Sequence, residues 1–123
     1  MTDINTTIAN YIAAWNESDP GLRQEAIART WTEAGSYLDS HRDSTGHEAL
    51  NAMIGAVQQM FPGYRFRLSS GIEKHHDRVR FSWQAGGVEG APLFFAGTDF
   101  ATIGADGRFV SVTGFTDAAP NFN

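Results

Sequence analysis

The sequence contains no cysteine, which excludes disulfide scaffolds, thiolate catalysis and cysteine-ligated metal sites. It also has no excess of positive charge: the formal net charge is −5 and the pI is near 5.2, which argues against nucleic acid as a partner. Phosphate-binding loops, nucleophile elbows and dinucleotide fingerprints are missing as well. We therefore expect no ATP, nicotinamide or serine-hydrolase chemistry, and we expect no cofactor.

Long apolar runs and repeats are absent too. The segment 1–15 has no positively charged region and no long apolar stretch, so we expect neither a signal peptide nor a membrane span, and a cytoplasmic location. A chain of 123 residues with 41% hydrophobic and 19% charged residues is typical of one globular domain, 1–123, with a single core. The aromatic content of 12% is enough either to close that core or to line a cavity.

The first part of the chain has apolar residues at spacings of three and four, which is typical of helices with one buried face. The first such segment is 3–18. Asp19 followed by Pro20 predicts the N-cap and the first position of a second helix, which we expect to extend to about Thr32.

A short strand and a third helix are expected next. The strand is predicted at 35–39, and a polar loop at 40–45 follows it. Thr45 and Glu48 have the spacing of a capping box, which predicts the start of the third helix, and Pro62-Gly63 predicts its end.

After residue 63 the hydrophobic period changes to two. Apolar and polar residues alternate at 64–69 and again at 79–85, which predicts two strands with one buried face each. Gly86-Gly87 interrupts the second strand and predicts a bulge, and 89–92 predicts a turn. This order predicts an α+β domain in which three N-terminal helices pack in a curved, mixed or antiparallel sheet.

The segment 93–117 predicts two long strands joined at Asp106-Gly107, a strong hairpin signal. Asp99 lies in the first of these strands among apolar residues, so it must find a partner, lie on a wet face or stay protonated. Alternation places four residues on its face: Phe95, Gly97, Ala101 and Ile103. The opposite face would carry Phe94, Ala96, Thr98 and Phe100. That face is also apolar and should be buried against another surface, so we expect a homodimer through the outer side of the sheet.

Several short motifs occur in a characteristic order along almost the whole chain. They are Tyr11 with Trp15-Asn16 before Ser18-Asp19, Trp31 before Tyr37-Leu38-Asp39, Gly46, Phe61-Pro62-Gly63, Gly97-Thr98-Asp99 and Asp106-Gly107-Arg108. The ordered set resembles the NTF2-like superfamily, which includes the SnoaL-like polyketide cyclases and the ketosteroid isomerases. The resemblance implies a cone whose open end admits a small hydrophobic or aromatic ligand, and it implies dimers through the outer sheet face.

The resemblance to ketosteroid isomerases extends to individual residues. Those enzymes use a tyrosine of the first helix, an aspartate after the first strand and an aspartate of the penultimate strand; Tyr11, Asp39 and Asp99 match these positions. The resemblance implies that Asp39 is the general base, and that Tyr11 and a neutral Asp99 donate hydrogen bonds to a carbonyl oxygen. One departure is that the family's base is commonly followed by proline, whereas Ser40-His41 follows here.

Each of these residues also has a structural explanation. Tyr11 could pack in the core, Asp39 could be a turn or capping residue, and Asp99 could pair with Arg80. The leading hypothesis is a cofactor-independent isomerase or cyclase that transfers protons on a hydrophobic carbonyl compound. The alternatives are epoxide-hydrolase-like activation of water by the Asp99–Arg80 pair, and a non-catalytic ligand-binding or dimerisation domain.

Other side chains are candidates for ligand binding. The tryptophans and Phe115 could line a pocket or fill the core, and Arg80 could face the ligand. His75 and His76 are adjacent, and adjacent strand residues point to opposite faces, which argues against a metal site. His76 is in phase with Tyr64, Phe66 and Leu68 and is therefore the one expected to face the cavity. The ligand-binding candidates are thus Trp15, Trp31, His76, Arg80, Trp83 and Phe115.

Overall fold

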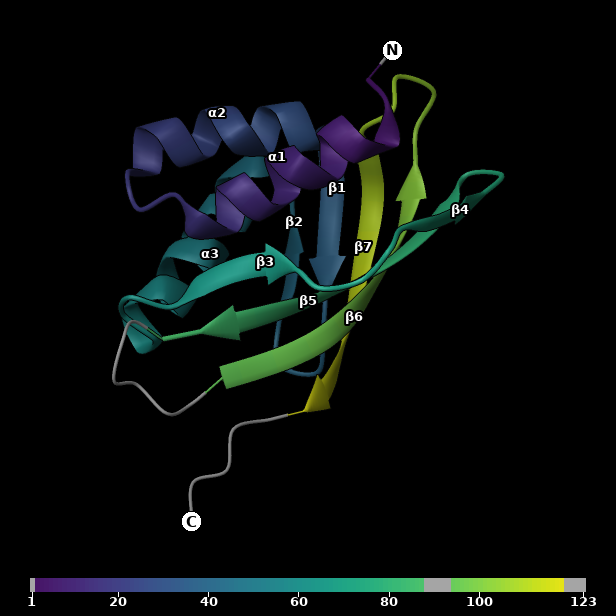
Figure 1. Cartoon of the computed structure of the whole chain (residues 1–123). Helices are drawn as coiled ribbons and strands as arrows, with labels where there is room; N and C mark the ends of the chain where they lie inside the picture. The colour runs from purple at the N-terminus through teal and green to yellow at the C-terminus, as the bar shows by residue number, and fades with distance from the viewer. Residues whose placement is uncertain (1, 88–93, 119–123) are drawn as a thin grey trace.

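The computed structural model describes residues 2–87 and 94–118. The elements follow in the order α1 (Ile4–Asn16), α2 (Pro20–Thr30), β1 (Trp31–Leu38), β2 (Asp43–Thr45), α3 (His47–Met60), β3 (Arg65–Leu68), β4 (Glu73–His75), β5 (Arg78–Gly86), β6 (Phe94–Ile103) and β7 (Phe109–Ala118). All three helices lie on one side of a strongly curved sheet (Figure 1). The predicted α+β architecture is therefore confirmed, although the short strands β2 and β4 were not predicted.

One helix end follows the predicted local chemistry, and two depart from the prediction. Asp19 caps α2, because its carboxylate accepts a hydrogen bond from the backbone N–H of Leu22 at 2.9 Å, with Pro20 at the first position. The α2 helix ends two residues earlier than predicted, because Trp31 already begins β1. The predicted capping box is wrong: Thr45 belongs to β2, and α3 is preceded by Gly46 at φ 91°, with no side-chain cap.

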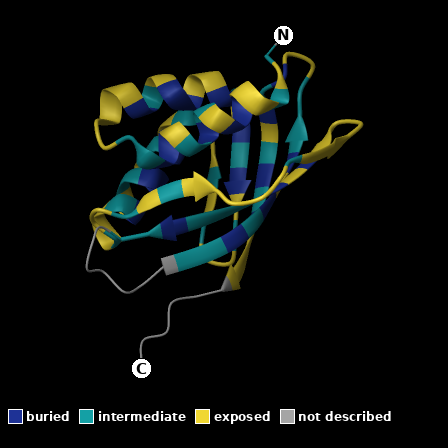
Figure 2. Ribbon diagram, in the orientation of Figure 1, coloured by how far each residue is buried: buried dark blue, intermediate teal, exposed yellow. Residues whose placement is uncertain are grey.

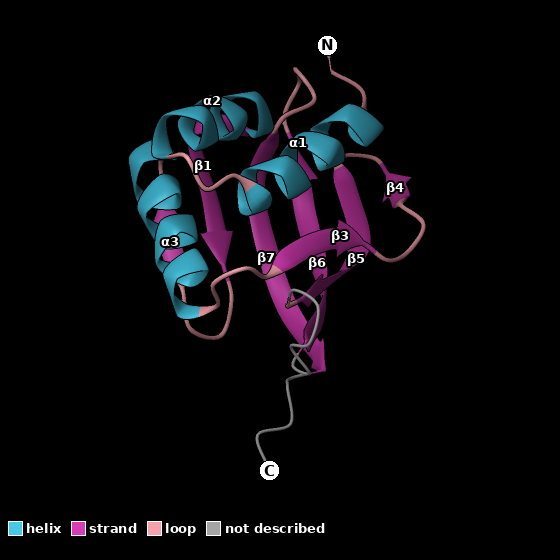
Figure 3. Cartoon of the chain, turned by 60° about the vertical axis from the view of Figure 1, so that its left-hand side comes forward, coloured by secondary structure: helices cyan, strands magenta, loops and turns pink. Residues whose placement is uncertain are grey.

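The sheet is mixed, with strand order β2-β1-β7-β6-β5-β3 and β4 paired to β5. Figure 3 shows β1, β7 and β6 side by side. β1 runs parallel to β7, and every other pairing is antiparallel. The predicted bulge at Gly86-Gly87 is wrong, because the ladder between β5 and β6 continues without a register shift to the pair Gly86–Phe94, where β5 ends. The turn predicted at 89–92 lies outside the described residues.

The hairpin between β6 and β7 turns at Asp106-Gly107, as predicted, with Gly107 at φ 88°. Its tip holds the start of α1. The backbone N–H of Thr2 donates to the Asp106 carbonyl at 3.0 Å, and the Thr7 hydroxyl donates to the Gly107 carbonyl at 2.7 Å. The helix that carries Tyr11 is thus fixed at one end to the hairpin that carries Asp99.

The core lies between the helices and the concave face of the sheet, where the buried positions of both layers meet (Figure 2). Its largest fully buried side chains are Trp31, Phe81 and Phe109, and burial of side chains of this kind stabilises the fold by about 1.5–3 kcal/mol each. Among the described helices, none is both long and apolar enough to cross a membrane.

The outer face of the sheet carries both apolar and polar side chains. Phe100 and Phe115 are exposed there, at 48% and 56%, and their rings pack edge to face at 5.9 Å. Around them, hydroxyl groups bond across the strands, as between Ser82 and Thr98 at 3.0 Å. The side chain of Phe94, also expected on this face, lies outside the described part of the structure.

Candidate functional site

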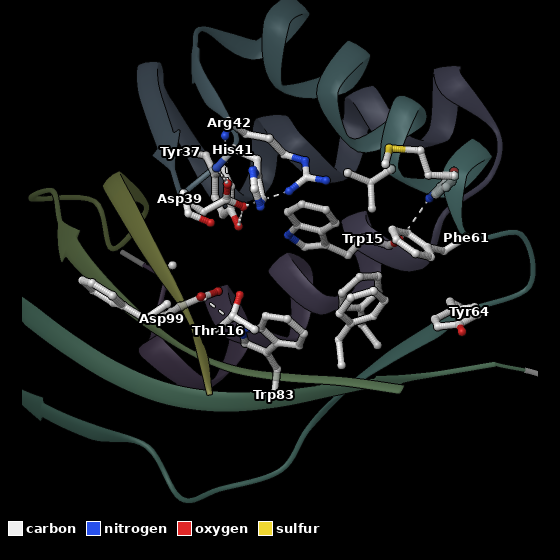
Figure 4. A pocket seen from close by; sticks show the side chains of 18 of the residues that line it. Trp15, Tyr37, Asp39, His41, Arg42, Phe61, Tyr64, Trp83, Asp99 and Thr116 are labelled. Atoms are coloured by element: carbon white, nitrogen blue, oxygen red, sulfur yellow. Dashed lines mark hydrogen bonds and ion pairs between the residues drawn. The ribbon is translucent and has the colours of Figure 1, made fainter. Parts of the chain in front are cut away.

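A cavity of about 790 Å³ lies between α1, α3 and the concave face of the sheet (Figure 4). Its size is that of a typical small-molecule site. One wall is mostly apolar and aromatic, with Ile12, Trp15, Val57, Met60, Phe61, Tyr64, Phe66 and Phe95. The other wall is polar and includes Tyr11, Tyr37, Asp39, Ser40, His41, Arg42, Asp99 and Thr116. Tyr11, Asp39 and Asp99, which the sequence singled out, therefore open onto one cavity.

Asp99 is 1% exposed and is held by donors from two other elements. The Tyr11 hydroxyl of α1 donates to its Oδ2 at 2.6 Å, and the Trp83 indole N–H of β5 donates to its Oδ1 at 3.0 Å. Gly97, two residues before Asp99, makes the second bond possible: a Cβ at this position would overlap the Trp83 ring. The missing side chain therefore lets the indole lie across β6 and reach the carboxylate.

The electrostatic state of Asp99 follows from this environment. Burial raises its pKa to about 6, against the hydrogen bonds from Tyr11 and Trp83, which favour the charged form. The negative charges of Asp39 and Asp117 contribute to this rise. The pKa of Tyr11 is raised well above its ordinary value by burial and by the Asp99 charge, so Tyr11 keeps its proton and acts as the donor. Asp99 is thus mainly ionised at pH 7 and close to its titration point.

Asp39 is in a different position, directly after β1. Its carboxylate accepts hydrogen bonds from the Tyr37 hydroxyl and from the backbone N–H groups of His41 and Arg42, each at 2.8 Å, and the Arg42 guanidinium lies at 3.3 Å. Burial acts to raise the pKa of Asp39, but these donors outweigh it, and the net pKa is below the ordinary value. Asp39 therefore has the turn role that the sequence left open, and it is a weak base.

Gly114 of β7 separates the two acid–tyrosine pairs. A Cβ at this position would lie 2.9 Å from Asp99 Oδ1, 3.0 Å from the Tyr37 hydroxyl and 3.6 Å from the Asp39 Cβ. Gly114 pairs with Asp99 in the β6–β7 ladder, so it points into the same cavity. Because it has no side chain, the Tyr11–Asp99 and Tyr37–Asp39 pairs can approach each other across it.

The structure separates the predicted ligand-binding aromatics into two groups. Trp15 and Trp83 line the cavity, as Figure 4 shows. Phe115 borders the cavity, although its ring packs against Phe100 on the outer face. Trp31 does not line the cavity: it is fully buried in the core, where its indole N–H donates to the Ser36 carbonyl at 3.1 Å, so its assignment as a ligand-binding residue is wrong.

The predicted positions of Arg80 and His76 at the cavity are wrong as well. Arg80 faces outward, opposite Phe100 in the ladder, and its guanidinium pairs with Glu73 at 3.2 Å, so the proposed Asp99–Arg80 pair does not form. His76 is exposed in the turn between β4 and β5 at φ 53°, and its ring contacts His75 and not the cavity. In residues 2–87 and 94–118, no group of three His, Cys, Asp or Glu side chains could hold a metal ion.

Sequence reasoning missed several residues of the site. Tyr37 is one that could have been found, because alternation on a strand places it on the same face as Asp39. Arg42 and Gly114 gave no usable signal: the first depends on the shape of a loop, and the second on the register between β6 and β7.

Comparison with known proteins identifies the family. The model of the SnoaL-like domain matches residues 8–112. The chain belongs to the SnoaL-like family. A crystal structure of a SnoaL-like family protein from Agrobacterium tumefaciens, described as a candidate isomerase, is similar over 96% of this chain and 100% of that one, with 36% identity and a TM-score of 0.86. The predicted NTF2-like fold is therefore confirmed.

More distant structures share the fold of this SnoaL-like protein. A candidate SnoaL-like polyketide cyclase from Jannaschia sp. matches 95% of this chain and 90% of its own, with 16% identity and a TM-score of 0.69. A candidate hydroxylase from Streptomyces galilaeus matches 92% and 87%, with 15% identity and a TM-score of 0.64. No curated protein is significantly similar to this chain.

Proposed function

We propose that this SnoaL-like protein is a cofactor-independent enzyme of the isomerase or cyclase type, which transfers a proton on a small hydrophobic carbonyl compound. The observation that carries the proposal is the buried Asp99 carboxylate, held by Tyr11 and Trp83 on the wall of a largely aromatic cavity. The descriptions of two relatives as a candidate isomerase and a candidate polyketide cyclase support the same class of reaction.

We assign the proton transfer to Asp99, and not to Asp39 as the family resemblance implied. A general base works best when its pKa lies near the working pH, and the pKa of Asp99 is raised by burial to about 6. The pKa of Asp39 is lowered instead, and its oxygens already accept four hydrogen bonds within the turn and from Tyr37. In this scheme Asp39 positions the turn and Tyr37 at the polar wall.

The proposed step balances without a co-reactant. The Asp99 carboxylate takes a proton from the carbon next to the carbonyl group, and the C–H electron pair becomes the C=C bond of an enolate. The carbonyl oxygen takes up the negative charge. The protonated Asp99 then returns the proton to the original carbon, which gives exchange, or to the far carbon of a conjugated enolate, which gives isomerisation. In a substrate with a second carbonyl group, the enolate carbon can instead attack that carbonyl carbon, which breaks its C=O π bond and closes a ring, and Asp99 gives its proton to the resulting alkoxide.

Deuterium exchange on simple model ketones tests this function. Hydrophobic ketones such as 2-tetralone are incubated with the protein in D₂O, and NMR follows the loss of the proton signals next to the carbonyl. We expect exchange above the buffer rate, rising with pH through about 6 as Asp99 ionises. Asp99→Asn should reduce it by at least about a hundredfold, in line with the usual contribution of a general base.

The matched control is Asp39→Asn, in which the other carboxylate of the same cavity loses its charge. Exchange that persists in Asp39→Asn and is lost in Asp99→Asn supports the assignment, and the reverse result transfers the role of base to Asp39. Ketone binding without exchange, equal in both variants, overturns the catalytic proposal in favour of a ligand-binding domain.

We also propose that the protein forms a homodimer through the outer sheet face. The support is the exposed pair of rings, Phe100 and Phe115. Light scattering at micromolar concentration checks this proposal: a dimer that Phe100→Ser converts to a monomer supports it, and a monomeric wild type contradicts it. The cytoplasmic location expected from the sequence stays a prediction.

A further inference from the structure

The three tryptophans differ in what their indole N–H groups bind. The Trp83 N–H donates to Asp99, and the Trp31 N–H donates to the Ser36 carbonyl. The Trp15 N–H is buried in a residue that is 6% exposed, and none of the described residues accepts a hydrogen bond from it. A buried donor of this kind costs free energy unless an acceptor reaches it, so its acceptor must come from the cavity that Trp15 lines.

The Trp15 N–H faces the polar side of that cavity. Figure 4 shows the nitrogen edge of the ring turned toward the side where Asp39 and Asp99 lie. The N–H also lies near the Tyr11 hydroxyl: Trp15 acts on it as a hydrogen-bond donor and lowers the pKa of Tyr11, against the larger effects of burial and Asp99, although the contact does not meet the geometry of a full hydrogen bond. An acceptor bound to Trp15 would therefore lie beside the Tyr11–Asp99 pair.

The Trp15 ring is held in this orientation. On the backbone side, the Gln58 side chain of α3 donates to the Trp15 carbonyl at 3.0 Å. The next residue, Asn16, bonds both the N–H and the carbonyl of Phe66 in β3, at 2.7 and 2.8 Å. The ring itself packs against Phe66 at 5.2 Å and Tyr37 at 5.5 Å. The donor is thus preorganised, and binding an acceptor there requires no rearrangement.

The chemistry of the wall limits what the acceptor can be. An indole N–H only donates, so the ligand must present a lone pair. Asp99 and Asp39 lie on the polar wall that the Trp15 N–H faces, and Arg42 is already paired with Asp39, so a negatively charged ligand group would meet uncompensated repulsion from Asp99. A neutral carbonyl oxygen fits both conditions, and the apolar wall to which Trp15 belongs accommodates the hydrocarbon that carries it.

We propose that the Trp15 indole N–H donates a hydrogen bond to the carbonyl oxygen of the substrate and thereby places the adjacent carbon in reach of Asp99. This inference rests on the proposed function and names the oxygen-binding group of that site. The other donors beside Asp99, Tyr11 and Trp83, are already bonded to its carboxylate. Trp15 supplies the N–H that stabilises the negative charge as it develops on the substrate oxygen.

Two ligands of nearly equal shape test the proposal, 2-tetralone and the hydrocarbon tetralin, which lacks the oxygen. We expect the wild type to bind the ketone about tenfold more tightly, in line with one buried hydrogen bond. Trp15→Phe should reduce this preference to about twofold or less, because it removes the N–H and keeps an aromatic ring. Trp31→Phe is the control, since its N–H is bonded inside the protein, and it should keep the preference.

NMR of the indole N–H signals gives a second measurement that needs no folded Trp15 variant. Ketone should shift the Trp15 signal downfield, tetralin should not, and the Trp31 signal of the same sample should stay in place. Equal binding of both ligands with no shift at Trp15 overturns this inference and leaves the pocket intact. Failure of both ligands to bind overturns the proposed function as well.

Discussion

The burial of Asp99 should make the stability of this protein depend on pH in a way that one substitution reveals. An aspartate has an ordinary pKa of 3.8, and burial raises the pKa of Asp99 to about 6. The folded state therefore binds a proton more tightly than the unfolded state does. Between these two values the unfolded chain loses its proton first, so the stability contribution of Asp99 is fully present below pH 3.8 and declines as the pH rises to 6.

The magnitude follows from the same numbers. A difference of about two pKa units at about 1.4 kcal/mol each corresponds to about 3 kcal/mol of unfolding free energy lost between about pH 4 and about pH 7.5. Asp99→Asn removes the titrating group and nearly preserves the shape of the side chain. A hydrogen bond that the amide fails to make to Tyr11 or Trp83 lowers the unfolding free energy by the same amount at every pH. It therefore does not affect how the unfolding free energy changes with pH.

The measurement is urea unfolding followed by tryptophan fluorescence at several pH values from about 4 to about 8. We expect the wild type to lose about 3 kcal/mol relative to Asp99→Asn across this range, with a plateau above about pH 7. Asp39→Asn serves as the control: the pKa of Asp39 is lowered from 3.8, so its stabilising effect is present above that value and is lost only as the pH falls below it, and the difference between the wild type and Asp39→Asn should stay nearly constant across the range measured. A difference between the wild type and Asp99→Asn that stays constant with pH would refute the reasoning.

Three further substitutions have defined outcomes. Tyr11→Phe removes a donor to the charged form of Asp99 and should raise the pKa of Asp99 above 6, which ¹³C NMR titration of the carboxyl group measures; an unchanged pKa contradicts this. Gly114→Ala places a Cβ 2.9 Å from Asp99 Oδ1 and should lower the unfolding free energy, measured with urea, by about 1–3 kcal/mol. Gly86→Ala is its control: its Cβ would lie in open space, so the unfolding free energy should change by less than about 0.5 kcal/mol. Arg23→Met should cost about 2–4 kcal/mol by the same assay, because the buried guanidinium bonds three oxygens, of which Asn51 Oδ1 and Gln58 Oε1 would lose their donor while the Glu17 carbonyl keeps a second one from Gln58; a loss below about 1 kcal/mol would show that water replaces it.

The sequence predicted the fold well because its signals are local. The change of hydrophobic period after residue 63 separates helices from strands, and Asp19-Pro20 and Asp106-Gly107 mark a helix start and a hairpin through their own backbone preferences. The capping box failed although its spacing was right. Thr45 pairs with Ser36 in the sheet instead, so tertiary pairing outweighed the local signal.

The site was predicted less completely because it depends on register and on loop shape. Arg80 would face the cavity if β5 were shifted by one residue, and only the observed pairing of Asp99 with Phe81 excludes this. His76 was placed by carrying the alternation of β3 through a turn whose left-handed backbone breaks that alternation. The position of Asp39 could be predicted from the family pattern, but its low pKa arises from loop N–H groups that no spacing reveals.

The parallel pairing of β1 with β7 has a consequence for how the chain folds during synthesis. β7 lies between β1 and β6, so the sheet remains in two separate parts until residues 109–118 have left the ribosome. Until then the apolar stripe of α1 has neither its complete sheet nor the hairpin tip that holds Thr7. A chain that ends at residue 107 should therefore show no cooperative unfolding transition by circular dichroism.

This order of assembly leaves Tyr11 and Trp15 exposed until residues 109–118 have been made. Folding dominated by such distant pairings is slow, and exposed apolar surface in the meantime favours aggregation. Tyr11 and Asp99 are 88 residues apart in the sequence, so they can meet only after β6 has been made. The pocket is thus among the last parts of the molecule to form, and a substitution that slows the docking of β7 would lower the yield of active protein even where it leaves the finished site unchanged.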